Sequence, residues 1–339
     1  MDKCLYLVSS SATREYVADC VEALAVPRGS ILHFRYLVPY VDERLRKTLA
    51  NSKGKLPRSL RNLPTVVVYL FQEQKGGQWT PQGAYLPLRC GRLIRAFIEG
   101  QVAHFFFEVT DYVKPKYRSL SIRDVLKKEG VKFKLRSGKP SFAHVGERLN
   151  IAAPQVRDSD VFQEFVQKVY RASEWRTRSL GIAPLDVTYE IIFFRVVGVF
   201  EQQGKDLIEV NPVPVFIGEN VFAEYALKSG ANYHIKVMTH LAPRLAGHLP
   251  GQGNVTLRLG FDSTVIKPTG PVSFRISSLY DLQYWSFVVD SLREQRTVLT
   301  VGCEQPKPPT QQDFVRKELL CPEVCLPVLV TNSARSTSP

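Results

Sequence analysis

The chain is organised around its most basic segment, residues 114–139, which read KPKYRSLSIRDVLKKEGVKFKLRSGK. This segment carries ten Lys or Arg residues and only two acidic residues, Asp124 and Glu129. From residue 131 to residue 136, apolar residues alternate with cations in the order Val, Lys, Phe, Lys, Leu and Arg. A period of two places the apolar side chains on one face of a β-strand and the cations on the other. The pattern therefore predicts a strand with one buried face and one cationic face that meets an anionic partner.

The excess positive charge of the chain is confined to its N-terminal part. The 339 residues carry a formal net charge of +13. Residues 1–150 contain 26 Lys or Arg and 13 Asp or Glu, whereas residues 151–339 contain 19 of each. Such an asymmetry is typical of a protein that binds polyanions through its charged part.

Residues 1–150 have the pattern of a mixed, strand-rich domain. Apolar and β-branched runs predict strands at residues 3–8, 30–40, 65–72, 84–88, 92–98, 102–112 and 131–136. Helical spacing of apolar residues predicts helices at residues 16–24, 42–49 and 119–129. These elements fit a small, partly open barrel or a curved sheet flanked by helices.

Residues 151–339 are organised differently. A polar segment at residues 150–160 marks the predicted domain boundary, and a helical pattern follows at residues 160–172. From residue 186, short strands alternate with turn signals such as Asn211-Pro212 and Pro250-Gly251, which is typical of an antiparallel β-sandwich. We therefore predict a β-rich α+β protein. It has a basic mixed domain at residues 1–150, a helix plus β-sandwich at residues 151–303, and a Pro-rich, partly disordered tail at residues 304–339.

The cysteines and the hydropathy pattern predict a cytoplasmic protein with reduced thiols. Six cysteines are scattered along a chain that is long enough to bury a core without disulfides. The N-terminal apolar run is too short for a signal peptide, and no stretch approaches eighteen apolar residues. We expect no membrane association.

Most enzyme classes lack their residues in this sequence. The six histidines form no metal-binding spacing, and Cys321 and Cys325 have no second pair to complete a zinc site. No Gly-x-Ser-x-Gly or Gly-x-Gly-x-x-Gly motif is present. We therefore expect no cofactor and no bound metal, and a non-enzymatic role is favoured.

One arrangement resembles a catalytic site. Asp42 follows a predicted strand, and Glu73-Gln74-Lys75 follows the next one. This order resembles the metal-dependent nucleases of the restriction-endonuclease type, in which two carboxylates would hold Mg²⁺ and the Lys would assist water or the scissile phosphate. One Glu-x-Lys is also what chance supplies in a chain of this composition, and Asp42 suits the first turn of a helix. The nuclease using Asp42, Glu73 and Lys75 is therefore kept as an alternative.

The cations predict DNA or RNA as the partner, bound largely through phosphates. The alternative is a solvated face that prevents edge-to-edge pairing of strands. Tyr117, Phe34 and Tyr36 are candidates for stacking on bases, and Phe34 suits the core equally well. The neutral C-terminal domain would dock another protein or form a homo-oligomer, and an assembly component without nucleic acid is the second interpretation. The predicted nucleic-acid-binding residues are Lys53, Lys55, Arg58, Lys114, Lys116, Arg118, Lys127, Lys128, Lys132, Lys134 and Arg136.

Overall fold

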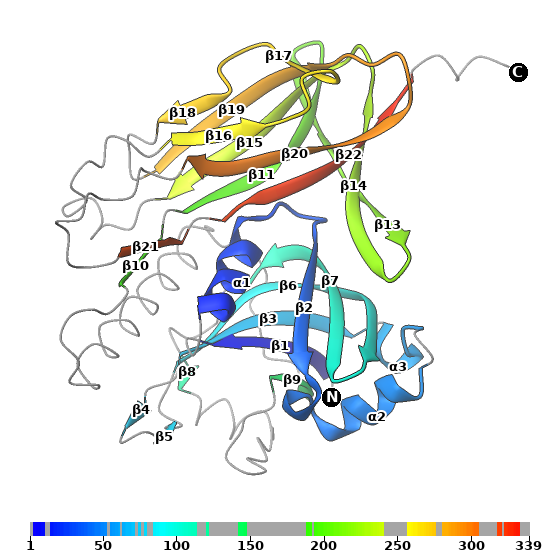
Figure 1. The fold of residues 1–339 in the computed structure, drawn as a ribbon, viewed down its shortest axis with the longest axis vertical. Coiled ribbons are helices and arrows are strands. Elements are labelled where there is room, and N and C mark those ends of the chain that lie inside the picture. Colours follow the sequence, from blue (N-terminus) through cyan, green and yellow to red (C-terminus); the bar gives the residue numbers. More distant parts are fainter. Residues whose placement is uncertain are drawn as a thin grey trace, which may run out of the picture. The chain divides into compact units, whose positions relative to one another are not determined.

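The computed structural model describes residues 3–10, 14–52, 55–61, 63–71, 74–75, 78–79, 84–113, 120–121, 142–147, 188–191, 193–240, 256–275, 280–304, 317–320 and 322–332. The chain divides into two compact units (Figure 1). The first holds the N-terminal sheet and helices, and the second holds the two sheets of the C-terminal part. The predicted boundary at residue 150 and the predicted helix at residues 160–172 lie outside the described residues.

The first unit is built on an open, mixed sheet of seven strands. Its order is β2-β7-β6-β3-β1-β9, with β8 paired to β6 off this path. The strands are β1 (Lys3–Ser10), β2 (Ile31–Leu37), β3 (Pro64–Phe71), β6 (Ala84–Glu99), β7 (Val102–Tyr112), β8 (Leu120–Ser121) and β9 (Ala143–Glu147). The pair β1–β3 is parallel and the other pairs are antiparallel. The sheet does not close, so the small barrel that the sequence allowed is not formed.

The helices of this unit are α1 (Arg14–Ala25), α2 (Glu43–Ala50) and the single turn α3 (Arg58–Arg61). A 3-10 turn, η1 (Val38–Tyr40), follows β2. The predicted apolar stripe of α1 is buried at Val17, Cys20, Val21 and Leu24, which recur at helical spacing. The Tyr112 hydroxyl donates to the Leu24 carbonyl oxygen at 2.6 Å and ties β7 to the end of this helix.

Strand position explains the hydropathy pattern of this sheet. The interior strands β1 and β3 are buried on both faces, so they read as continuous apolar runs. The edge strand β2 alternates instead, and buries Leu32, Phe34 and Tyr36 while the residues between them are exposed or half-buried. Phe34 and Tyr36 are therefore core residues and do not act as stacking platforms, which corrects the prediction made for them.

The second unit contains two sheets and fits the predicted β-sandwich. The five-stranded sheet has the order β12-β11-β15-β19-β17 and is antiparallel throughout. Its strands are β11 (Phe193–Gln203), β12 (Asp206–Val210), β15 (Asn232–His240), β17 (Ile266–Pro268) and β19 (Tyr280–Val289). The Phe274 and Trp285 rings, one from each sheet, lie 5.0 Å apart between their centroids and join the sheets in one core.

The other sheet of this unit has six strands in the order β13-β14-β22-β20-β16-β18. Its strands are β13 (Val213–Ile217), β14 (Asn220–Lys228), β16 (Thr256–Gly260), β18 (Ser273–Arg275), β20 (Gln295–Glu304) and β22 (Val324–Thr331). The pair β14–β22 is parallel, whereas the remaining pairs are antiparallel. Two further two-stranded pairs complete the described strands: β4 (Gln74–Lys75) with β5 (Gln78–Trp79), and β10 (Thr188–Ile191) with β21 (Lys317–Leu320).

Several elements differ from the sequence prediction, which did not include the short strands β9, β17 and β21. Strand β14 was not predicted, and β22 lies where a partly disordered tail was expected. Leu120 and Ser121 pair with β6 as a strand, although a helix was predicted from residue 119. The two strands expected at residues 84–88 and 92–98 are one strand, β6, interrupted by bulges. At the first bulge, a side chain on Gly91 would collide with the Glu108 carbonyl, so only glycine fits there.

Candidate nucleic-acid interface

The structure describes only part of the predicted interface. Lys55 and Arg58 are both exposed. The remaining predicted residues lie outside the described part of the chain: Lys53, Lys114, Lys116, Arg118, Lys127, Lys128, Lys132, Lys134 and Arg136. Tyr117 also lies outside it. The cationic strand at residues 131–136 therefore stays a prediction, and the described interface is built from the α2–α3 segment, residues 43–61.

The α2–α3 segment begins with a capped helix. The Asp42 carboxylate accepts hydrogen bonds from the backbone N–H groups of Arg44 and Leu45, at 2.9 and 3.3 Å. Asp42 therefore satisfies two donors that the first turn would otherwise leave without a partner. Glu43 pairs with Lys47 one turn later, at 3.2 Å. Glu43 is the only acid in residues 43–61, which contain seven Lys or Arg residues.

The cations at the C-terminal end of this segment remain unneutralised. Lys55, Arg58 and Arg61 are exposed, and none has a hydrogen-bond or ion-pair partner among the described residues. Arg58 and Arg61 are three residues apart in α3, which places them on neighbouring positions of one turn. The segment thus presents a short row of positive charge at the surface of the first unit.

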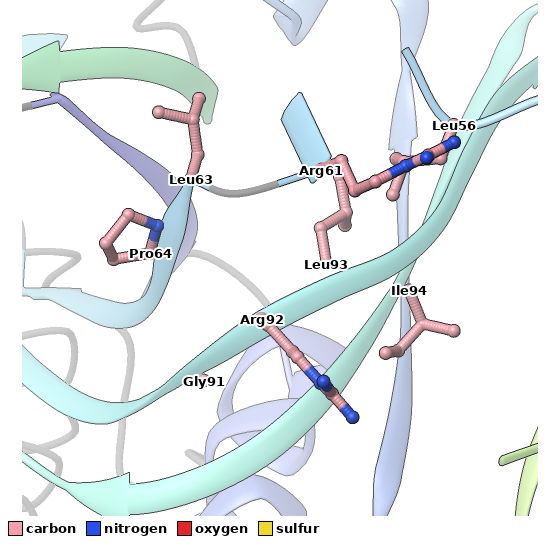
Figure 2. A pocket seen from close by; sticks show the side chains of 8 residues that line it. All are labelled: Leu56, Arg61, Leu63, Pro64, Gly91, Arg92, Leu93 and Ile94. Atoms are coloured by element: carbon pink, nitrogen blue, oxygen red, sulfur yellow. The ribbon is translucent and has the colours of Figure 1, made fainter. Parts of the chain in front are cut away.

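A pocket of about 590 Å³ lies next to these cations, between the α2–α3 segment and strands β3 and β6 (Figure 2). We name it the arginine pocket. Arg61 extends across it toward Leu56, and Leu93 points toward Arg61 from β6 (Figure 2). Its lining residues are Leu56, Arg61, Leu63, Pro64, Gly91, Arg92, Leu93 and Ile94. The volume falls in the range of about 300–1,000 Å³ that is usual for ligand sites.

The second arginine of the pocket is directed elsewhere. The Arg92 side chain leaves β6 on the side opposite Leu93 (Figure 2). Its Nε donates to Glu108 Oε2 at 2.6 Å, so the guanidinium is held against β7. The arginine pocket therefore combines apolar walls from three leucines with one cation, Arg61, at its mouth. Such a combination suits a group with an apolar part and a negative charge.

A histidine cluster lies on the face of β2, β7 and β6 that carries Arg92. The register pairs His33 with Phe106 and His104 with Phe97, which puts all four rings on one face. His33 stacks on Phe106 with 4.2 Å between ring centroids, and His104 stacks on Phe97 at 4.8 Å. His33 Nε2 lies 3.0 Å from His104 Nδ1, so one imidazole donates to the other.

The electrostatics of this cluster keep His33 neutral near pH 7. Burial and, to a smaller extent, the neighbouring His104 and Arg35 together lower the pKa of His33 to about 4. Arg35 is exposed beside it on β2, and the Arg95 guanidinium carbon lies 5.2 Å from the centre of the Phe97 ring. The only acid in contact with His104 that the structure records is Glu99, at 3.7 Å. This face of the sheet therefore adds aromatic rings and cations to the first unit.

The structure describes the side chain of only one of the three residues of the nuclease alternative, which stays a prediction. Asp42 has the capping role described above, while Glu73 lies outside the described residues and Lys75 is described only by its backbone in β4. Within the described ranges, no three His, Cys, Asp or Glu residues lie close enough together to hold a metal ion.

Comparisons with known proteins assign no relationship. No protein-family model matches the chain, and no curated protein matches it. No described helix is long and apolar enough to cross a membrane.

Sequence reasoning found part of this interface and missed the rest. The cationic loop around Lys55, Arg58 and Arg61 is visible as a run of cations without acids. The histidine cluster joins residues that are 71 positions apart, and the arginine pocket joins Arg61 to Leu93. The register of β2, β7 and β6 forms the histidine cluster, and the packing of α3 beside β6 forms the pocket. No local pattern in the sequence encodes either arrangement.

Proposed function

We propose that this protein is a non-enzymatic nucleic-acid-binding protein of the cytoplasm, which contacts phosphates of DNA or RNA through its basic first unit. The observation that carries the proposal is the set of three exposed cations, Lys55, Arg58 and Arg61, that have no partner among the described residues. Exposed cations without an acidic partner can neutralise phosphates and make charge-assisted hydrogen bonds to them.

The surroundings of these cations support the proposal. The arginine pocket offers apolar walls beside Arg61, and nucleobases have apolar faces that pack against such walls. Phosphate contacts of this kind position a nucleic acid without reading its sequence. The predicted cationic strand at residues 131–136 would extend the same surface. The reduced state proposed for the thiols is in keeping with the five described cysteines, which form no disulfide with one another.

The proposal is tested by binding of labelled single- and double-stranded DNA and RNA over a salt series, with and without Mg²⁺. Several phosphate contacts predict that the logarithm of affinity falls linearly with the logarithm of salt, by about 0.7–0.9 per contact. Absence of binding to all four polymers at low salt would reject the proposal. Cleavage that appears only with Mg²⁺ would replace it with the nuclease.

A protein-interaction role is the second candidate, and one observation favours it. The second unit exposes several large apolar side chains on β12, β13 and β14: Leu207, Ile208, Val213, Phe216, Ile217 and Phe222. Contiguous exposed apolar residues of this kind mark interaction surfaces more often than isolated ones do.

A further inference from the structure

The apolar side chains of the second unit gather on a hairpin that extends past its sheet. Among the described strands, β13 pairs with β14 alone. Residues 220–224 of β14 pair with β13, whereas residues 225–228 pair with β22. The outer half of β14 and the whole of β13 therefore form an arm beyond the sheet (Figure 1). We name residues 213–224 the apolar hairpin.

The two faces of the apolar hairpin differ in exposure, because Val221 and Ala223 are buried on one face, whereas Val213, Ile217 and Phe222 are exposed on the other. Phe216 lies on the face of Val221 and Ala223. Phe216 is 59% exposed and Ile217 is 53% exposed, so the described strands of this sheet leave more than half of each side chain uncovered. A two-stranded hairpin is marginally stable alone, and it gains stability when such side chains are buried. The exposed apolar side chains of this arm are typical of a surface that binds another protein.

The free edge of β13 is blocked against strand addition. Ile217 and Asn220 close a two-residue turn, in which Gly218 has a positive φ of 59°. Because the closing pair of such a hairpin is hydrogen-bonded, the backbone groups of Pro214 and Phe216 point away from β14. Pro214 has no N–H to donate there. A partner must therefore bind through the side chains of the hairpin rather than by extending its sheet.

The charges in and around the apolar hairpin indicate what kind of partner it can bind. Residues 201–228 contain five Asp or Glu and two Lys. Two of the five acids are paired, Glu201 with Lys228 and Glu224 with Arg296. Glu219, at the turn, is exposed and has no ion-pair partner among the described residues. Two such hairpins would repel each other, so the chemistry favours a basic partner with an apolar recess.

This chain supplies such a surface. The arginine pocket has walls from Leu56, Leu63 and Leu93, and the unneutralised Arg61 crosses its mouth (Figure 2). Its volume of about 590 Å³ exceeds that of any single side chain. We propose that the apolar hairpin of one copy docks in the arginine pocket of a second copy, with Ile217 and Phe222, which share a face, among the leucines and Glu219 beside Arg61.

This contact joins two different surfaces, so each copy keeps one free hairpin and one free pocket. Contacts of this head-to-tail kind form closed rings or open filaments rather than simple two-fold dimers. The inference does not depend on nucleic-acid binding, but both use Arg61. Nucleic acid and self-association are therefore expected to compete for the same surface.

Sedimentation velocity of the full chain in nucleic-acid-free buffer, over a wide range of concentration, tests the proposal. The wild-type chain is expected to associate as concentration rises. Glu219→Lys and Arg61→Glu should each weaken association by about tenfold or more, because each places like charges together. Arg293→Glu and Glu294→Lys, at exposed positions of the loop before β20, are the matched controls and should leave association unchanged.

The charge swap separates this contact from misfolding. A chain that carries both Glu219→Lys and Arg61→Glu restores the opposite charges across the contact, and it should associate again. Mixing the two single variants should also restore association, because each supplies the surface that the other has lost. A wild-type chain that stays monomeric at every concentration overturns the proposal. Association that the single variants leave unchanged, or that neither the swap nor the mixture restores, also overturns it.

Discussion

The edge strands β2 and β13 differ in the polarity of their exposed side chains. Strand β2 buries Leu32, Phe34 and Tyr36 and places the polar His33 and Arg35 on its other face. Strand β13 carries no charged residue and leaves Val213, Phe216 and Ile217 more than half exposed. The outward face of β2 is therefore polar and cationic, whereas β13 leaves apolar side chains exposed. The two units are therefore suited to different partners.

The regions around β2 and β13 also differ in net charge. Near β2, residues 43–61 hold seven Lys or Arg and one Glu, and Lys55, Arg58 and Arg61 are among the cations with no described partner. Around β13, residues 201–228 hold five acids and two Lys. A cationic surface binds polyanions with a strong dependence on salt, while an apolar surface does not. Mutations in each of the two edge regions test this difference.

The largest difference is expected between two phenylalanines in these edge regions. Phe34→Ala removes a ring that is 3% exposed and should cost about 3–5 kcal/mol of unfolding free energy. Phe216→Ala removes a ring that is 59% exposed and should change stability by about 0.5 kcal/mol or less. Hydrogen exchange of β2 and β14 peptides in urea reports each unit separately. A large loss of protection from Phe216→Ala alone would show that the hairpin is covered in the wild-type chain.

The cap of α2 is expected to have a smaller effect. Asp42→Ala removes the acceptor of two backbone N–H groups and should cost about 1 kcal/mol, measured by urea unfolding of the first unit. Asp42→Asn keeps a capping oxygen and should retain most of that stability. The paired variants also separate two roles of Asp42. If the wild-type chain cleaved nucleic acid with Mg²⁺ and Asp42→Asn abolished cleavage without loss of stability, the residue would be a metal ligand.

The smallest expected effect is the pH dependence of the histidine cluster. Burial, with the neighbouring His104 and Arg35, lowers the pKa of His33 from 6.5 to about 4 in the folded chain. As the pH falls, the unfolded state therefore takes up the proton first, and stability of the first unit should decrease from about pH 6.5 to about pH 4. We expect a loss of about 1 kcal/mol after allowance for solvent screening of a half-exposed ring.

The control for this pH dependence is His33→Gln, which should flatten the profile of the first unit over the same pH range. His234 of the second unit also has a lowered pKa from burial, and His234→Gln serves as the comparison that leaves the first unit unchanged. A profile of the first unit that is insensitive to His33→Gln would contradict the assignment of the effect to this ring.

The strand content of this protein could be predicted where burial or alternation is strong. The continuous apolar run at residues 65–72 and the alternation in β2 identify interior and edge strands of the first sheet. The Asn211-Pro212 turn and its neighbours likewise indicate a β-sandwich. The local sequence is sufficient in these regions, because the hydropathy pattern of each strand reflects whether one or both of its faces are buried.

Other elements depend on partners that are distant in the chain. Strand β14 contains Ala223, Glu224, Ala226, Leu227 and Lys228, which favour helices, and pairing with β13 and β22 overrides that preference. Strand β22 follows a proline-rich stretch and was therefore assigned to a tail, yet it lies between β14 and β20. Register between remote strands also creates the histidine cluster. Single-sequence patterns carry no information on such register.

The proposed function requires that the unneutralised cations of the α2–α3 segment bind phosphate. The most direct test compares oligonucleotide affinity over a salt series for Lys55/Arg58/Arg61→Ala and for the matched triple Lys205/Lys267/Arg293→Ala, which removes three exposed cations from the second unit. We predict that the first triple weakens binding about tenfold and lowers the salt slope by about two to three, while the second leaves both unchanged. Equal losses in the two triples, or no loss in either, would contradict the claim.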